Sequence, residues 1–223
     1  MRIAETFGAI AWFDVWAWAS DLLVNQAWPG VVNTVILTQV ALVVTGVLSL
    51  AMFPLISPHF FGRFGRSIGH IGLVVIRSTP EYVLALVFLL LWGPSMLPAV
   101  VALALHNGAI IGHLIGRNTE TLNLRPDPIR RTDRYFYEVL PRVYPQFLAI
   151  LFYRWEVIMR ETAIFGILGI ATLGFYIDSA FADLRFDRAL FLIVITAMLN
   201  ISIDMISRRV RARLRLKTRP DII

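Results

Sequence analysis

The chain has no Asp, Glu, Lys or Arg between Leu22 and Gly62, and this charge-free run restricts its fold more than any other feature. A helix needs roughly 20 apolar residues to cross the hydrocarbon core of a bilayer, which is about 30 Å thick. The segment 31–57 is long enough and consists mostly of Val, Leu, Ile, Ala and Thr, so it predicts a membrane span. The chain is 57% hydrophobic and 16% charged, whereas soluble domains average about 45–50% and about 25%. We therefore expect an all-α, multi-span membrane protein, and a soluble globular enzyme is nearly excluded.

Four further segments have the length and apolar character of membrane spans. The second predicted span carries Arg77, Pro80 and Glu81, and the fourth carries four charged residues. The five predicted spans cover residues 31–57, 68–92, 96–115, 147–170 and 189–206. They define a transmembrane domain over residues 31–216, followed by a short cytoplasmic tail at 217–223.

Residues 1–30 do not fit a cleaved signal peptide, because Asp14 interrupts the apolar run and no small-residue cleavage pattern follows. The segment carries Trp12, Trp16, Trp18 and Trp28. Tryptophan is enriched at membrane–water interfaces, so the pattern predicts an amphipathic helix lying at the outer interface. A helix packed against a partner subunit explains the same pattern, and both interpretations stay open at this point.

The basic residues predict the orientation of the chain, because Lys and Arg concentrate in the cytoplasmic loops of membrane proteins. Net charge is +6, and the tail after Ile206 is rich in arginine, which places the C-terminus in the cytoplasm. Counting back through the spans puts the Arg-rich loop 117–145 in the cytoplasm too. The segment 171–188 and the N-terminus, where acidic residues outnumber basic ones, then lie outside.

Several kinds of chemistry have no support in the sequence. There is no cysteine and no G-x-x-x-x-G-K-[ST] phosphate loop, so any ATP must be bound by another chain. The four histidines do not have the spacing of a metal site, and we expect ordinary interhelical hydrogen bonds from them. The basic tail has few aromatic residues among its arginines, which favours membrane lipid over nucleic acid as its surroundings.

The fourth predicted span holds Arg154, Glu156, Arg160 and Glu161. Charges inside a span are costly and usually face the bundle interior or a wet cavity. Glu156 and Arg160 are four apart in the favourable order for a helical ion pair. Arg154 and Glu161 share a different face, so they need partners on another span, for which Arg77 and Glu81 are candidates. These groups are either neutralised structural pairs or part of a translocation path for an anion, and the residues alone do not decide between the two.

The loop between the third and fourth spans is the other distinctive feature. It is amphipathic in parts and ends in Glu138-Val139-Leu140-Pro141. Pro141 and Pro145 predict a turn that leads into the start of the next helix. A structured cytoplasmic loop of this kind is typical of a docking element for a partner protein.

Five motifs in these regions, in this order, resemble those of the membrane permease subunit of phosphonate-type ATP-binding-cassette (ABC) importers. They are Arg-Ser-Thr-Pro-Glu at 77–81, Glu-Thr-Leu at 120–122, Val-Leu-Pro-Arg-Val-Tyr-Pro-Gln-Phe at 139–147, Tyr-Arg-Trp-Glu at 153–156, and the Arg-rich run 204–211. The resemblance covers roughly residues 31–216. The loop departs from the family pattern, because Pro126 stands where the family has glycine and the loop is slightly longer.

The resemblance implies a type I ABC importer permease with about five transmembrane helices, located in the bacterial inner membrane. It implies a second permease subunit, identical or paralogous, two ATPase subunits that bind the ATP, and an external substrate-binding protein. The substrate class is a phosphonate or a related phosphorus oxyanion such as phosphite. Coupling to the ATPase would fall to Glu120, Leu140, Pro141 and Arg142. The candidates for the translocation path are Arg77, Glu81, Asn107, Arg154, Glu156, Arg160 and Glu161. No catalytic residue and no cofactor or metal of its own is expected.

Two other functions remain as alternatives. A membrane-embedded enzyme acting on a phosphorus-containing headgroup would need a polar catalytic cluster at one interface, and only charges in mid-span are available for it. A passive channel would conduct its substrate without any nucleotide. Activity of the isolated chain would favour the enzyme, and flux without nucleotide would favour the channel.

Overall fold

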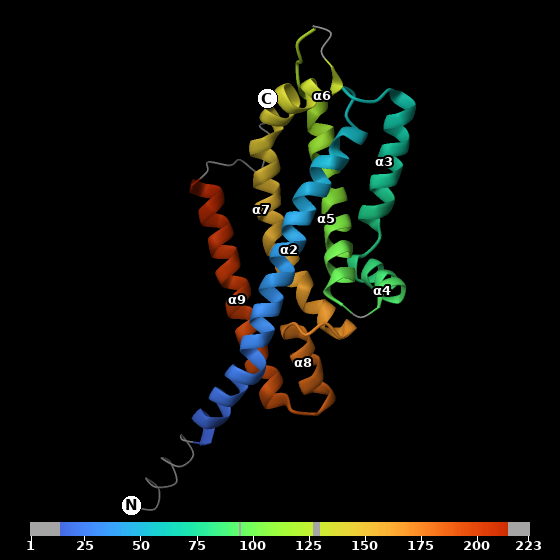
Figure 1. Ribbon diagram of the computed structural model, residues 1–223. Coiled ribbons are helices and arrows are strands. Elements are labelled where there is room, and N and C mark those ends of the chain that lie inside the picture. The colour runs from blue at the N-terminus through green and yellow to red at the C-terminus, as the bar shows by residue number, and fades with distance from the viewer. Residues whose placement is uncertain (1–13, 94, 127–129, 214–223) are drawn as a thin grey trace, which may run out of the picture.

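The computed structural model describes residues 14–93, 95–126 and 130–213, and within these ranges the regular structure is entirely helical. The helices form an elongated bundle in which α5 and α2 occupy the middle (Figure 1). Helices α7 and α9 lie on one side of this pair, and α3 and α4 lie on the other. The expected all-α membrane architecture is confirmed.

The first span is longer than predicted. Asp14–Leu55 is one helical rod of 42 residues, which includes a π-helical turn at Leu23–Ala27, α2 over Trp28–Met52 and a 3-10 turn at Phe53–Leu55. At 1.5 Å per residue the rod is about 63 Å long, roughly twice the thickness of a hydrocarbon core. The helix has no break at residue 31, where we expected an interfacial segment to give way to a span. Trp12 lies outside the described residues.

Helix α5, Met96–Asn118, packs against α2 at close range. Gly108, Gly112 and Gly116 are spaced four apart, so they form a stripe along the face of α5 that meets α2. A methyl group on Gly116 would lie 2.3 Å from Cγ1 of Ile56 and 2.8 Å from the carbonyl oxygen of Phe53. Small residues at this spacing let two helix backbones approach closely, as is common inside membranes.

The predicted second span, 68–92, is wrong as a single helix. The structure has α3 over Arg63–Ser78 and α4 over Glu81–Trp92, and the two are bent by 90° at the break. Pro80 causes the break, because proline disfavours helical geometry in the residue before it, and Thr79 adopts an extended ψ of 123°. With 12 residues, α4 is only about 18 Å long and cannot cross a bilayer by itself.

The C-terminal half also differs from the prediction. Helix α7 runs over Leu140–Ile164 and is followed by a 3-10 turn at Phe165–Leu168. The segment 171–188, expected to be an external loop, contains α8, Leu173–Ala182, and the start of α9, Phe186–Arg213. Gly174 lets α8 fold back onto the end of α7, since a methyl group there would lie 1.8 Å from the carbonyl oxygen of Ala163.

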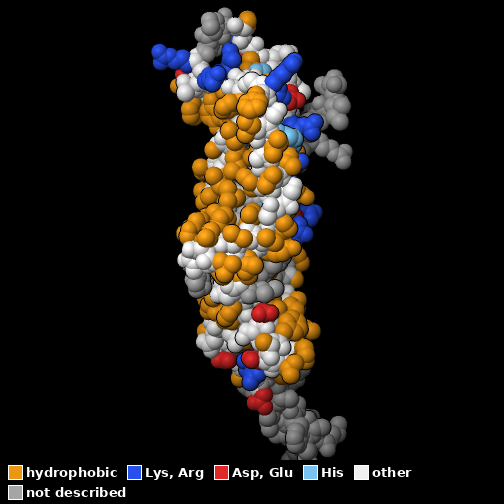
Figure 2. Space-filling model, turned by 90° about the vertical axis from the view of Figure 1, so that its right-hand side faces the viewer, with side chains coloured by type: hydrophobic (Ala, Val, Ile, Leu, Met, Phe, Trp, Pro, Cys, Tyr) orange, Lys and Arg blue, Asp and Glu red, His pale blue; other side chains and the backbone are white. Residues whose placement is uncertain are grey.

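Three helices within the described ranges are long and apolar enough to cross a membrane, and the bent pair α3–α4 adds a fourth crossing if it acts as one span. Helix α7, with 25 residues, is long enough to cross a membrane, but its charged residues make it less apolar than these helices. It packs among α2, α5 and α9. Figure 2 shows apolar side chains over the middle of one face, with arginines gathered at one end and most acidic groups at the other. We call these the basic end and the acidic end. The start of α3, the end of α5 and the start of α7 lie at the basic end (Figure 1).

Candidate translocation site

A polar contact between α5 and α7 lies within the bundle. The side chain of Asn107 on α5 is fully buried. Its Nδ2 donates to Oε2 of Glu161 on α7 at 3.0 Å and to the carbonyl of Leu103 at 3.1 Å. Its Oδ1 has no hydrogen-bond partner in the described part of the chain. Two of the predicted path residues, 54 positions apart in sequence, are thus in direct contact.

The break between α3 and α4 carries a second set of polar contacts. The backbone carbonyl of Thr79 lies at the break, outside the regular hydrogen bonding of a helix. Its oxygen is 2.9 Å from Nδ1 of His106 on α5. The other ring nitrogen of His106 lies 3.7 Å from Oε2 of Glu81, the first residue of α4. His106 therefore holds both sides of the break. Only ordinary interhelical hydrogen bonding was predicted for His106, and its place beside Glu81 was not predicted, although His106 directly precedes Asn107.

These two sets of contacts form one cluster, which we call the break cluster: Glu81, His106, Asn107, Arg154 and Glu161. Arg154 belongs to this set because it lies seven residues before Glu161 on the continuous helix α7, which puts the two side chains on one face. The expected shared face of Arg154 and Glu161 is therefore seen. The direct partner of Glu161 is the amide of Asn107, however, and not the guanidinium of Arg77. Arg77 lies in the last turn of α3, two residues before Thr79 at the break.

Glu156 and Arg160 lie on another face of α7, away from Asn107. They form the expected ion pair at 3.2 Å, with 58% of the Arg160 side chain and 22% of the Glu156 side chain exposed. This face meets α9, because Phe152 accepts a hydrogen bond from Ser207 and Tyr153 lies under the guanidinium of Arg211. The seven candidates thus divide into the break cluster, Arg77 beside it, and a pair that faces α9.

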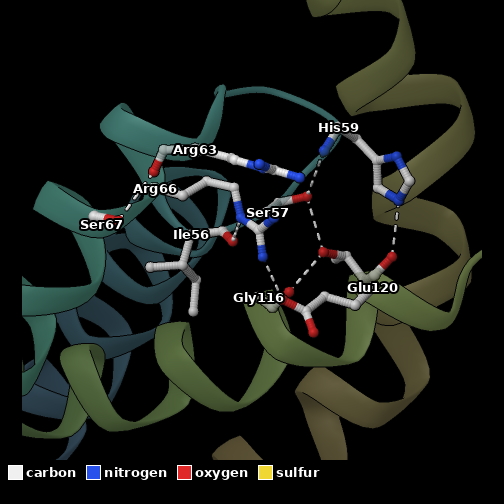
Figure 3. A network of polar contacts seen from close by, with 9 residues as sticks. Ile56, Ser57, His59, Arg63, Arg66, Ser67, Gly116 and Glu120 are labelled. Carbon is white, nitrogen blue, oxygen red and sulfur yellow. Dashed lines mark hydrogen bonds and ion pairs between the residues drawn. The ribbon is translucent and has the colours of Figure 1, made fainter.

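At the basic end, the residues around Glu120 form a compact network (Figure 3). Glu120 lies in a 3-10 turn, Thr119–Thr121, directly after α5, and its carboxylate accepts a hydrogen bond from Arg66 of α3 at 2.5 Å. The buried hydroxyls of Ser57 and Thr119 are hydrogen bonded at 2.8 Å, and Nε2 of His59 donates to the Thr119 carbonyl at 2.8 Å. The end of the first helical rod, the start of α3 and the end of α5 are thereby tied together.

The other predicted coupling residues do not form the expected turn. Leu140 and Pro141 are helical, since α6, Arg131–Asp133, and a π-helical segment, Arg134–Val139, continue directly into α7. Proline is tolerated in the first turn of a helix because the missing N–H has no partner there. Pro145, also expected at a turn, lies inside α7.

Arg142 has a clear role in this region. Its Nη1 donates to the carbonyl of Asn123 at 2.7 Å, and its Nη2 lies 3.7 Å from Glu138. The nearly buried Glu138 accepts a hydrogen bond from the backbone N–H of Arg125 at 2.6 Å. The pair therefore fastens the extended segment after Glu120 to the start of α7. No role was predicted for Glu138, although its spacing from Arg142 is that of a helical ion pair.

The structure resembles solved ABC transporter chains. A crystal structure of an amino acid ABC transporter with histidines matches with a TM-score of 0.70 and 18% identity, over 90% of this chain and 98% of that chain. The MetNI methionine ABC transporter, in inward-facing conformations, matches with a TM-score of 0.63 and 15% identity, over 86% of this chain and 96% of that chain. The chain has the fold of a type I ABC importer permease.

Proteins similar in sequence are permeases as well, which confirms the resemblance inferred from the motifs. The phosphite transport system permease protein PtxC of Stutzerimonas stutzeri is 28% identical over 74% of this chain and 61% of its own length. The phosphate-import permease protein PhnE of Mycolicibacterium smegmatis is 28% identical over 60% of this chain and 26% of its own length. A putative cryptic phosphonate transport system permease protein of Escherichia coli, PhnE2, is 25% identical over 50% of this chain and 97% of its own length. No protein-family model matches the chain.

The chain therefore spans 61% of the first of these relatives and 26% of the second. The relatives are permease proteins and not enzymes, in agreement with the expectation from sequence. Together with the apolar helices, they identify a multi-pass membrane protein.

Proposed function

We propose that this chain is the permease subunit of an ATP-driven importer for a phosphorus oxyanion of the phosphonate or phosphite type. The observation that carries the proposal is the agreement between the permease fold and relatives whose names specify phosphite, phosphate or phosphonate transport. The importer would lie in the bacterial inner membrane, with the basic end of this chain in the cytoplasm, because arginine-rich loops stay on that side.

The partners would be a second permease subunit, two ATPase subunits and an external binding protein. The basic end is suited to meet an ATPase, because two pairs of residues brace it: Arg66 with Glu120, and Arg142 with Glu138. ATP would bind to the partner, since this chain has no phosphate loop. The segment after Glu120 would carry the motion of the ATPase to α5 and α7, the helices that supply Asn107 and Glu161.

The break cluster is the proposed narrow part of the path. A helix break at membrane depth leaves backbone groups free for a polar cavity, and such irregular backbone is tolerated only inside protein or beside water. Arg77 and Arg154 are the cations nearest to the break, and they would lower the electrostatic barrier for an anion. Glu81 and Glu161 would keep the anion from binding too tightly to be released.

Reconstitution tests this function directly. Proteoliposomes containing the permease, its ATPase subunits and the binding protein should accumulate labelled phosphite or methylphosphonate only when ATP is supplied. The purified complex should hydrolyse ATP faster when loaded binding protein is added. Uptake without nucleotide would indicate a channel, and failure of any ATPase chain to co-purify would contradict the proposal.

Arg154→Gln should reduce uptake at least about tenfold, because a cation beside the path lowers the barrier to an anion in a site of low dielectric. Arg160→Gln is the matched control, since it removes the same charge from the same helix but on the face toward α9. The measurement is the initial rate of ATP-dependent uptake at equal amounts of folded complex. Equal losses in the two variants would remove the distinction between the two faces of α7.

Glu120→Gln should change the free energy of unfolding by less than about 1 kcal/mol, because exposed ion pairs contribute little. The side chains of Arg66 and Glu120 are 33% and 45% exposed. The stimulation of ATP hydrolysis by the binding protein should nevertheless fall severalfold, since the pair joins α3 to α5 at the proposed docking end. Arg208→Gln, which breaks the pair of an exposed arginine with Asp204 on α9, should leave stimulation unchanged. Normal stimulation in Glu120→Gln would contradict the assignment of Glu120 to coupling.

A further inference from the structure

A cleft of about 590 Å³ opens at the basic end, beside the first two turns of α3 and the end of α5. It is separate from the break cluster and shares no residue with it. Its polar lining consists of three arginines, two other donors or acceptors and one carboxylate. The residues are Arg63, Arg66, Ser67, His70, Arg117 and Glu120, with Ile56 and Ile71 as the apolar part.

The cleft has an excess of positive charge. Arg66 is neutralised by Glu120, and its Nε also donates to the carbonyl of Ile56 at 3.1 Å. Arg63 and Arg117 have no carboxylate within 4 Å among the residues that the structure describes. Two guanidinium groups from different helices therefore lie on one cleft without a counter-ion. Figure 3 shows the side chains of Arg63 and Arg66 extending together from the start of α3.

The surrounding structure favours an anion in this position. Helix α3 begins at Arg63, and its N-cap, Gly62, offers no side chain to the free N–H groups of the first turn. The positive end of this helix dipole adds to the field of the arginines. Arg117 lies in the last turn of α5 and lines the cleft from the side opposite α3, so two helices contribute guanidinium groups to it. The ring of His70, which lines the cleft from α3, lies against that of His113 on α5, with 5.0 Å between the ring centroids.

We propose that this cleft binds a phosphate group, with the guanidinium groups of Arg63 and Arg117 as its ligands and His70 beside them. The planar fork of a guanidinium presents paired N–H donors that match the oxygens of a phosphate. Glu120 does not oppose such a ligand, because Arg66 already neutralises it. The ligand is either free phosphate or the headgroup of an anionic phospholipid, since both offer the same charged oxygens at this end of a membrane protein.

Binding experiments on the full-length chain, purified in its transporter complex, can test the site and identify the source of the phosphate. In nanodiscs of phosphatidylcholine, the complex should bind labelled inorganic phosphate saturably if the ligand is free phosphate. In nanodiscs that also contain phosphatidic acid, native mass spectrometry should instead detect retained phosphatidic acid if the ligand is a lipid. Each arm is measured for the wild type, for Arg63→Gln with Arg117→Gln, and for a control with Arg209→Gln and Arg213→Gln, two exposed arginines of α9.

Arg63→Gln with Arg117→Gln should weaken binding at least about tenfold in one of the two arms, since each charge-assisted contact is among the stronger hydrogen bonds. The control removes the same net charge and should leave binding unchanged. Replacing both arginines by lysine should restore part of the affinity, because the charge remains. An unchanged melting temperature in the glutamine double variant shows that the site, and not the fold, was lost.

Three results would overturn the proposal. The first is the absence of binding in both arms, and the second is binding that the double variant leaves intact. The third is a double variant that releases the ATPase subunits without any effect on phosphate or phosphatidic acid, which would make the cleft a protein contact. None of these measurements depends on uptake, so failure of the transport proposal and failure of this site are distinguishable.

Discussion

Asn107→Leu is expected to destabilise the protein by about 2–3 kcal/mol, because hydrogen bonds to charged groups are worth about that much and the carboxylate of Glu161 would be left without its donor. Leucine has the same branching and the same number of side-chain heavy atoms as asparagine, so the substitution removes the hydrogen bond without leaving a cavity. The free energy of unfolding, measured by denaturation in detergent micelles, is the direct test. Uptake by the reconstituted transporter should be lost as well, since α5 and α7 are no longer joined at the break cluster.

The double variant Asn107→Leu with Glu161→Leu separates stability from transport. Removing both partners leaves no unsatisfied charge, so most of the lost stability should return. Uptake should not return, because the polar lining is gone. Asn25→Leu is the matched control, since it removes an amide-to-carboxylate bond to Asp21 that is exposed. Stability of the double variant no better than that of Asn107→Leu would mean that the contact is not an isolated pair.

Gly116→Val is expected to have the larger effect on folding, about 3 kcal/mol or more, because overpacking of a close helix contact forces the backbones apart. Even a single methyl group would lie 2.3 Å from Cγ1 of Ile56 and 2.8 Å from the carbonyl oxygen of Phe53. The yield of monodisperse protein and its unfolding midpoint in micelles report the effect.

Two further variants make this prediction specific. Gly72→Ala, on α3, adds a methyl group with nothing within 4 Å, and it should be neutral or slightly stabilising because alanine favours helices over glycine. Combining Gly116→Val with Ile56→Ala should recover only part of the loss, since the carbonyl of Phe53 belongs to the backbone and cannot be trimmed. Full recovery would show that only the side chain of Ile56 restricts this contact.

Hydropathy was sufficient to predict where the main apolar helices lie, because the bilayer imposes a minimum length on each of them. It failed at Pro80, where the chain bends by 90° within a segment whose average hydropathy still satisfies the requirement for a span. Average hydropathy does not indicate the direction in which a helix runs. The bend comes from local effects of proline, which lacks an N–H and imposes an extended geometry on Thr79. Helix α8 was missed because it is too short, at 10 residues, to be detected as a span. It also lies in a region where acidic residues indicated a loop.

The candidate site was predicted in part. The spacing of residues along α7 correctly separated Glu156 and Arg160 from Arg154 and Glu161, because positions on one helix follow a fixed period. The contact between Asn107 and Glu161 could not be derived in the same way, since it depends on how two helices pack. The Leu140–Pro141 turn was wrong because proline occurs both in turns and in the first turn of a helix, and the residues before it are helical here.

The rod Asp14–Leu55 also determines how a displacement would spread through the molecule. A tilt of about 5° around its midpoint moves each end by about 3 Å, given a length of about 63 Å at 1.5 Å per residue. The rod departs from α-helical geometry only at Leu23–Ala27 and in its last turn, Phe53–Leu55. Because π-helical turns loosen the regular hydrogen-bond ladder, Leu23–Ala27 is where the rod can flex most easily. From Trp28 to Met52 the rod is regular α-helix, so a shift of its end at Leu55 is transmitted along the rod to the turns near Trp28.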